Sequence, residues 1–259
     1  MVIEHNCACV QQITVEGLQG WFDQKCQMVK VVTAAAYLLQ IQHFLDWCMK
    51  ERNLLLFNAA KKVRVPKYNK NVRRRFLSLP DLQRLLDNCE DPELKFAIYA
   101  MGHAGMRYSE CDEARPEWFD MERKLIQVQA SDSWQPKNGK NRVVPMTSEF
   151  YEFLQIYGRP SPFMVGPHKK EKGRWRYRYD LTRALNQLTR ELGLEISPHD
   201  LRRTFASLKV SAGVSIFKVA RWLGNRVEIC ERHYAHLSPV DTDIDVGFER
   251  KAPLKPAAA

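Results

Sequence analysis

Residues 197–239 read SPHDLRRTFASLKVSAGVSIFKVARWLGNRVEICERHYAHLSP, and this stretch has the clearest helix boundaries in the chain. Ser197 stands where an N-cap would start a helix, and Gly213 can end that helix in the left-handed conformation. Ser215 can then cap a second helix, which Gly224 ends. We therefore expect two consecutive helices here, in a region rich in arginine and histidine.

Upstream of these helices, the sequence combines helical patterns with a few short strands. Ser78 precedes LPDLQRLLDNC, whose leucines recur at helical spacing. Residues 125–129 (LIQVQ) and 142–146 (RVVPM) are short β-type runs, and Asn138-Gly139 between them is a strong hairpin signal. The expected fold class is mainly α with a small antiparallel β-sheet, an α+β arrangement.

Residues 14–57 are expected to form a small helical bundle. Apolar positions recur there at three- and four-residue steps and predict one buried helical face: Tyr37, Ile41, Phe44 and Leu45. Thr33, ahead of three alanines, is the expected N-cap of this helix.

A basic stretch, KKVRVPKYNKNVRRR (residues 61–75), follows and contains no acidic residue. Its cations are Lys61, Lys62, Arg64, Lys67, Lys70, Arg73, Arg74 and Arg75. Pro66 discourages a continuous helix and like charges repel, so an extended and exposed segment is expected. It can be a solvated linker only, or a linker that lies against phosphates, which we favour. The expected division is a helical unit over 1–60, a linker over 61–76 and a larger domain over 77–259.

A second basic stretch, HKKEKGRWRYRYD, covers residues 168–180. Arg174, Arg176 and Arg178 alternate there with aromatic residues. The alternation fits a β-strand with one cationic face and also a basic-aromatic surface for nucleic acid. Both interpretations can hold together.

The composition indicates a folded, basic protein. A hydrophobic content of 45% suffices for a buried core and argues against general disorder. The formal net charge of +10 and a pI of about 9.3 favour a polyanionic partner. No stretch approaches the roughly 18 apolar residues of a membrane span.

The cysteines favour a reducing compartment. There are seven, an odd number at scattered spacing, and no secretory signal precedes them. A cytoplasmic protein with free thiols is therefore expected. His5, Cys7 and Cys9 have no second ligand pair at finger-like spacing after them, so no metal site is expected.

The candidate functional residues are unremarkable one at a time. Arg107 and Arg202 could each be an ordinary surface arginine. His199 alone would more often be a hydrogen-bonded structural histidine. Tyr234 alone would more often be half-buried packing.

Their order along the chain is far more specific. G-x-R-x-S-E around Arg107 is followed by a lysine hairpin and by S-P-H-x-L-R-R-T-x-A, which holds His199 and Arg202. L-G-N and H-Y-A-H come next, with Tyr234 nine residues after the asparagine. In these motifs the chain resembles the tyrosine recombinase (phage integrase) family over essentially residues 30–239. The resemblance implies a helical core-DNA-binding domain followed by a tyrosine-recombinase catalytic domain.

The resemblance also implies roles for single residues. Arg107 and Arg202 match the two arginines that hold the scissile phosphate, and Glu110 matches the acid that orients the first of them. His199 matches the residue that assists proton transfer. Tyr234 matches the nucleophile.

Two positions leave questions open. Lys137 matches the hairpin lysine that protonates the departing 5′ oxygen, and Lys140 is a second candidate because the sequence does not determine the hairpin register. Asn225 stands where most members of the family carry histidine. An amide can donate a hydrogen bond to a non-bridging oxygen, but it carries neither proton nor charge. We therefore expect chemistry weakened by roughly 10- to 100-fold.

The expected function is that of a site-specific DNA recombinase or integrase that works through a 3′-phosphotyrosine on Tyr234. The expected partners are double-stranded DNA and, on paired sites, further copies of the chain in a homotetramer. No metal, other cofactor or membrane is expected, and the place of action is the nucleoid. One alternative is a type IB topoisomerase-like nicking and closing enzyme. The other is a weakened or inactive DNA-binding relative that uses a helix-turn-helix in residues 205–223.

Overall fold

A computed structural model describes residues 9–68, 75–131, 134–158, 162–166, 168–171, 174–177 and 180–239. The chain divides into two compact units, Met1–Arg73 and Arg74–Ala259. Each unit has a hydrophobic core of its own. The mainly helical fold with a small antiparallel sheet agrees with the expected fold class.

The first unit is built on two helices, α1 (Val15–Met28) and α2 (Val31–Lys50). The side chain of Thr14 accepts a hydrogen bond from the backbone N–H of Gly17 and so starts α1. The short 3-10 turns η1 (Val10–Gln12) and η2 (Ala59–Lys62) complete the unit. Its core consists chiefly of Leu18, Trp21, Phe22, Ala34, Leu38, Leu45 and Ala60.

One expectation about α2 is wrong and a second holds in part. Its N-cap is Lys30, so Thr33 lies inside the first turn. Of the expected buried face, Leu45 is in the core and Ile41 packs against it, whereas Tyr37 and Phe44 are each 48% exposed. The buried residues of the helix are Ala34, Leu38, Leu45 and Cys48. Apolar residues surround much of this helix, and contact with α1 and η2 decides which of them are covered.

The first residues of the segment expected as a linker, 61–64, are attached to the first unit. Val63 is 8% exposed and belongs to the core of the first unit. The Gln19 side chain accepts a hydrogen bond from the backbone N–H of Arg64 at 2.8 Å and donates one to its carbonyl at 3.3 Å. Lys61 forms an ion pair with Asp46 at 2.8 Å. Of the other cations expected in the linker, Lys70, Arg73 and Arg74 lie outside the described residues.

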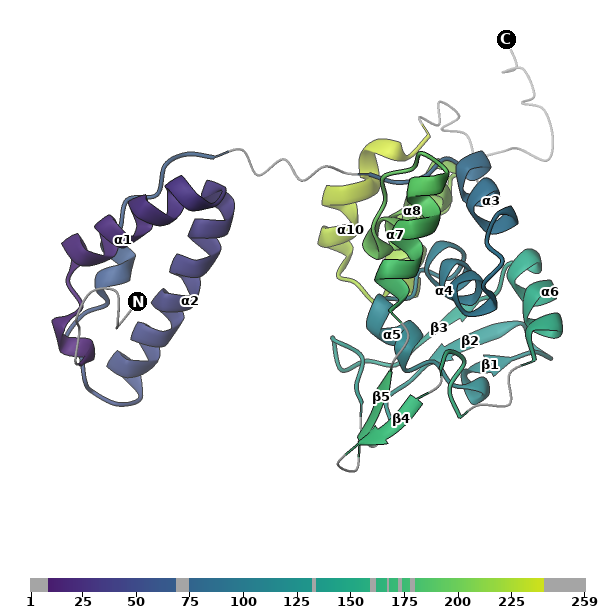
Figure 1. Ribbon diagram of the computed structural model, residues 1–259, viewed down its shortest axis with the longest axis horizontal. Coiled ribbons are helices and arrows are strands. Elements are labelled where there is room, and N and C mark those ends of the chain that lie inside the picture. Colours follow the sequence, from purple (N-terminus) through teal and green to yellow (C-terminus); the bar gives the residue numbers. More distant parts are fainter. Residues whose placement is uncertain are drawn as a thin grey trace, which may run out of the picture. The chain divides into compact units, whose positions relative to one another are not determined.

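In the second unit, helices surround one central helix, α4 (Pro92–Gly102), which is buried from Glu93 to Gly102 except at Lys95 (Figure 1). Its helical neighbours are α3 (Leu79–Asp87), α5 (Tyr108–Asp112), α6 (Ser148–Tyr157), α7 (Leu181–Glu191) and α8 (Pro198–Ser211). Ser78 is the N-cap of α3, because its side chain accepts a hydrogen bond from the backbone N–H of Asp81.

The main sheet has the strand order β1-β2-β3 and is antiparallel throughout. Its strands are β1 (Phe119–Asp120), β2 (Leu125–Val128) and β3 (Arg142–Pro145). Val128 pairs with Arg142 and Ile126 with Val144, so the predicted β2–β3 hairpin is confirmed. A second hairpin joins β4 (His168–Glu171) to β5 (Arg174–Tyr177), which places Arg174 and Arg176 on a strand, while Arg178 lies outside the described residues.

The helices expected in residues 197–239 begin and end as the sequence predicts. Ser197 and Asp200 form a capping box at the start of α8. α9 (Ile216–Leu223) follows, and Gly224, with φ +61°, ends it in the left-handed region. α10 (Val227–Tyr234) and η4 (Ala235–Leu237) complete the unit. None of the described helices combines the length and apolar character needed to cross a bilayer.

Candidate active site

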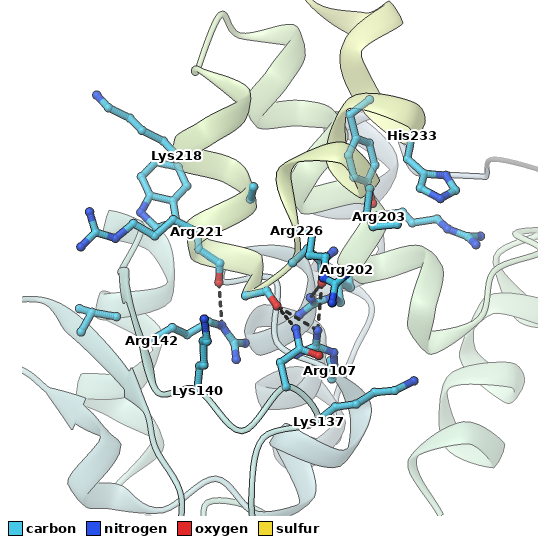
Figure 2. Close-up of a pocket in the computed structure, with 18 of the residues that line it drawn as sticks. Arg107, Lys137, Lys140, Arg142, Arg202, Arg203, Lys218, Arg221, Arg226 and His233 are labelled. Carbon is cyan, nitrogen blue, oxygen red and sulfur yellow. Dashed lines mark hydrogen bonds between the residues drawn. The ribbon is translucent and has the colours of Figure 1, made fainter. Parts of the chain in front are cut away.

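Two arginines from distant parts of the second unit converge on one side chain. Arg107 immediately precedes α5, and Arg202 lies on α8. One terminal nitrogen of each guanidinium donates a hydrogen bond to Oδ1 of Asn225, at 3.0 Å from Arg107 and 3.2 Å from Arg202. The two guanidinium groups therefore lie next to each other at the centre of the site (Figure 2).

A buried carboxylate lies beneath these arginines. Glu110 is fully buried and accepts hydrogen bonds from Arg107, at 2.6 Å from the backbone N–H and 2.9 Å from the guanidinium. Arg142 binds both of its oxygens, at 2.8 and 2.5 Å. Burial would raise the pKa of Glu110, but the hydrogen bonds and charge of Arg142, with the backbone hydrogen bond of Arg107 and the charge of Arg202, outweigh it and lower the pKa to about 2. Glu110 is therefore an anion at neutral pH.

Arg202 is held by backbone carbonyls as well as by Asn225. Its guanidinium donates to the carbonyl of Gly105 and, at 2.6 Å, to that of Leu223. Burial and the positive charge of Arg107 lower the pKa of Arg202 to about 9, so the side chain remains a cation at pH 7. One carboxylate thus faces three arginines, which leaves the centre with excess positive charge that suits an anionic ligand.

Arg142 is the site residue that sequence reasoning missed. It is the first residue of β3, and its side chain is only 4% exposed. Its Nε donates a hydrogen bond to the carbonyl of Trp222 at 2.7 Å, at the end of α9 (Figure 2). The strand alternation was the available signal, because Arg142 is on the same side of the strand as buried Val144 and Met146.

Asn225 lies between the two arginines. Guanidinium groups only donate hydrogen bonds, so the amide must present its oxygen to Arg107 and Arg202. Burial raises the pKa of the Cys230 thiol, and a hydrogen bond with Asn225 and the charge of Arg202 reduce this rise. Asn225 is thus an acceptor between the arginines in the protein without DNA.

Tyr234 ends α10 and is 9% exposed. Burial and the neighbouring Cys230 raise the pKa of its phenol, while Arg202 and Arg203 act in the opposite direction. The hydroxyl is therefore protonated at neutral pH, and attack on an electrophile requires a proton acceptor.

His199 has the properties of such an acceptor. Burial, together with the positive charges of Arg203 and Arg202, lowers the pKa of its imidazole below the ordinary value of 6.5. Asp200 opposes this effect but is outweighed. The imidazole is consequently uncharged at neutral pH.

The β2–β3 turn carries both candidate lysines, Lys137 and Lys140, and both are exposed. Between them, the side-chain amide of Asn138 donates a hydrogen bond to the carbonyl of Gly224 and so attaches the turn to the loop of Asn225. Figure 2 shows the two lysines on different sides of the arginines. The choice between them stays open.

A cleft of about 1400 Å³ brings these groups together. Its walls include every residue predicted to act in the chemistry: Arg107, Lys137, Lys140, His199, Arg202, Asn225 and Tyr234. Further cations line it, namely Arg203, Lys218, Arg221 and Arg226, and no acidic residue is among the described residues of its walls. The cleft therefore favours a polyanion.

Some of the residues predicted to bind DNA are not among those that line this cleft. Lys61, Lys62, Arg64 and Lys67 are exposed in the first unit. Arg75 pairs with exposed Glu195 at 3.0 Å in the second unit. Within the described ranges, no group of three histidine, cysteine or acidic side chains could hold a metal ion.

The sequence model of the phage integrase family matches residues 75–240. The tyrosine recombinase XerA of Saccharolobus solfataricus is 27% identical over 212 residues, which cover 80% of this chain and 64% of that protein. The integrase of Salmonella phage P22 is 28% identical over 218 residues, 81% of this chain and 55% of the integrase. The chain thus spans about 55–64% of the length of these curated relatives.

Solved structures share the fold. An integrase of the transposon Tn1549 in complex with a circular intermediate DNA aligns with a TM-score of 0.70 at 16% identity, over 88% of this chain and 82% of that one. A lambda integrase (75-356) dimer bound to a COC' core site aligns with a TM-score of 0.67 at 16% identity, over 87% and 81%.

Proposed function

Because the chain belongs to the phage integrase family, we propose that it is a site-specific DNA recombinase that cuts and rejoins strands through a covalent bond to Tyr234. The observation that carries this proposal is the pair Arg107 and Arg202, held together over buried Glu110 in a cleft that also contains Tyr234 and His199. The target is the phosphodiester backbone of double-stranded DNA.

The arginines address the main obstacle to the reaction. A phosphodiester anion repels nucleophiles, and two guanidinium groups neutralise that charge and stabilise the charge that builds up in the transition state. The oxygen of Asn225 occupies donors of both arginines before DNA arrives. We expect the scissile phosphate to compete for these donors.

Proton transfers complete the cleavage step. The Tyr234 oxygen attacks phosphorus, and its proton passes to neutral His199. The bond from phosphorus to the 5′ oxygen breaks, and Lys137 or Lys140 protonates that oxygen. The products are a 3′-phosphotyrosine and a free 5′-hydroxyl, so the ester energy is retained for rejoining without a metal or ATP.

The assembly follows from the reaction. Exchange between two duplexes requires four cleavages, so four copies of the chain on paired sites are the expected active form. The related lambda integrase crystallised as a dimer on a core site, and the Tn1549 integrase with a circular intermediate DNA. Action at the bacterial or archaeal nucleoid, in the cytoplasm, is part of this proposal.

Covalent capture tests the proposal without knowledge of the target. The protein is incubated with a pool of duplexes that carry a randomised stretch and nicks at varied positions, so that cleavage near a nick releases a short fragment and traps the adduct. Denaturant-stable complexes are recovered, their DNA is sequenced, and mass spectrometry locates the modified residue. We expect one enriched sequence family attached at Tyr234.

Two variants and one second substrate complete the test. Tyr234→Phe should abolish the adduct, whereas Tyr151→Phe, which removes a hydroxyl from α6, should not. No adduct with the wild-type protein, or an undiminished adduct with Tyr234→Phe, contradicts the proposal and leaves a DNA-binding relative. Relaxation of supercoiled plasmid by a protein that never exchanges strands between two duplexes indicates a topoisomerase-like enzyme instead.

A further inference from the structure

Arg142 makes three directed hydrogen bonds that end on two different segments. Both terminal nitrogens bind the carboxylate of Glu110, and Nε binds the carbonyl of Trp222. Such a fork geometry is specific to arginine, since the planar guanidinium presents its donors in fixed directions. The side chain is nearly fully buried, so water does not weaken these bonds.

Each segment that Arg142 joins carries, or directly binds, residues that line the cleft. β3 itself continues from the turn that holds Lys137 and Lys140. Glu110 binds the backbone and the guanidinium of Arg107. Trp222 precedes by three positions Asn225, which receives the hydrogen bonds of both arginines.

The packing around Gly224 adds a steric reason for the same connection. A Cβ placed on Gly224 would lie 3.1 Å from Cδ of Arg142, closer than side chains normally pack. Glycine, which also tolerates the positive φ of +61° there, lets the arginine stem pass directly beneath the loop. The position of this loop therefore depends on the Arg142 side chain.

We infer that Arg142 is a positioning residue for the reaction proposed above: it holds Arg107, the Asn225 loop and the lysine turn in register without contacting the phosphate. The effect of Arg142 on the reaction rests on the proposed function, whereas the positioning of Arg107 and of the Asn225 loop does not. From the start of β3, the one side chain of Arg142 binds both Glu110 and the end of α9.

The first experiment needs no DNA. Signals of the Arg107 and Arg202 Nε–H groups and of the Asn225 backbone amide are recorded by NMR in the free protein. Arg142→Gln should shift or broaden the Arg107 and Asn225 signals while most signals of the first unit stay in place. Arg123→Gln, in the exposed β1–β2 turn, removes the same charge and should move none of the three. Unchanged Arg107 and Asn225 signals in Arg142→Gln overturn the inference whatever the enzyme does.

The second experiment measures cleavage on the duplex enriched by covalent capture. Arg142→Gln should lower the single-turnover rate at saturating DNA by about 10- to 100-fold, the range expected when catalytic groups are displaced by about 1 Å. The DNA concentration for half-maximal rate should change much less. Arg142→Lys should stay close to Arg142→Gln, because one ammonium cannot make all three directed bonds.

A double variant separates positioning from stability. Glu110→Gln combined with Arg142→Gln removes both members of this buried ion pair and should recover part of the decrease in melting temperature caused by Arg142→Gln, because Arg202 remains buried beside position 110. The cleavage rate should remain low, since the bond to Trp222 and the support of Arg107 are still missing. A rate that recovers with the melting temperature, or wild-type activity in Arg142→Lys, contradicts the inference. If the wild-type protein forms no adduct, the proposed function fails while the NMR result still decides the role of Arg142.

Discussion

The arginines around Glu110 and the cations at the end of the first unit carry the same charge in opposite surroundings. Arg142 and Arg202 are each 4% exposed at their side chains and are fixed by hydrogen bonds to a carboxylate or to backbone carbonyls. Lys62 and Arg64 are exposed, and no side-chain ion pair is found for either in the described structure. Burial converts a charge into a positioned donor, whereas exposure leaves it mobile and screened by salt. The first kind suits chemistry on one phosphate, and the second suits attraction to any phosphate.

The largest expected effect on the cleavage rate comes from a buried arginine, Arg202. Arg202→Lys keeps the charge and loses the fork that binds Gly105, Leu223 and Asn225. We expect the single-turnover cleavage rate to fall about 10²- to 10³-fold, the usual cost of removing one transition-state donor. Arg190→Lys, on the exposed face of α7, is the matched control and should cleave normally. Equal rates for wild type and Arg202→Lys would mean that positive charge alone suffices at this position.

Asn225→Asp tests the shared acceptor. A carboxylate between Arg107 and Arg202 would bind both more strongly and would repel a phosphate. The melting temperature should therefore rise while cleavage slows by about 10- to 100-fold, because bonds between two charged partners replace bonds in which only the arginine is charged. Asn225→Ala separates the causes, because it removes the acceptor without adding charge and should leave the melting temperature unchanged or lower. A faster Asn225→Asp enzyme would show that the oxygen of residue 225 does not compete with the substrate.

The pH dependence of cleavage tests the proposed role of His199. The pKa of His199 is lowered below 6.5 by burial and by Arg203 and Arg202. If the neutral imidazole accepts the proton of Tyr234, the pH at which the rate has fallen to half should lie below 6.5. The rate should fall by about tenfold per pH unit below the pKa of the imidazole.

His199→Gln provides the control for this profile, because glutamine does not titrate. The acidic decline should disappear along with most of the activity. Asp112, whose pKa burial and Glu113 raise to about 7, is another group that titrates near this range. A decline that persists in His199→Gln would implicate a group of that kind instead.

The smallest effect on the reaction is expected from the exposed cations of the first unit, Lys62 and Arg64. Lys62→Gln combined with Arg64→Gln should weaken DNA binding about equally on all sequences and flatten its salt dependence by about one unit of slope for each phosphate that is no longer neutralised. The cleavage rate at saturating DNA should not change. Arg123→Gln combined with Arg190→Gln removes the same charge from the second unit as a comparison. Binding isotherms at several salt concentrations measure this slope. A slope equal to that of the wild-type protein would mean that Lys62 and Arg64 do not contact DNA phosphates.

Sequence patterns could reveal residues whose neighbours in the chain are distinctive. His199 and Arg202 are three apart on one helix, and local spacing brings them to the same face. Arg142 had no such context, since its partners Glu110 and Trp222 are 32 and 80 residues away. The covered face of α2 was mispredicted in part for a similar reason, because apolar residues on more than one side compete and only packing selects among them.

Local chemistry along the chain was enough to establish the caps of α8 and α9, the β2–β3 turn and the family motifs, because these depend on residues a few positions apart. Long-range packing decided that Glu110 is a buried anion with its pKa near 2, that Asn225 presents an oxygen rather than a donor, and that Arg142 joins three segments. The physical reason is that desolvation and hydrogen-bond direction are properties of a site in three dimensions. A sequence names the groups, and their partners and burial set what those groups can do.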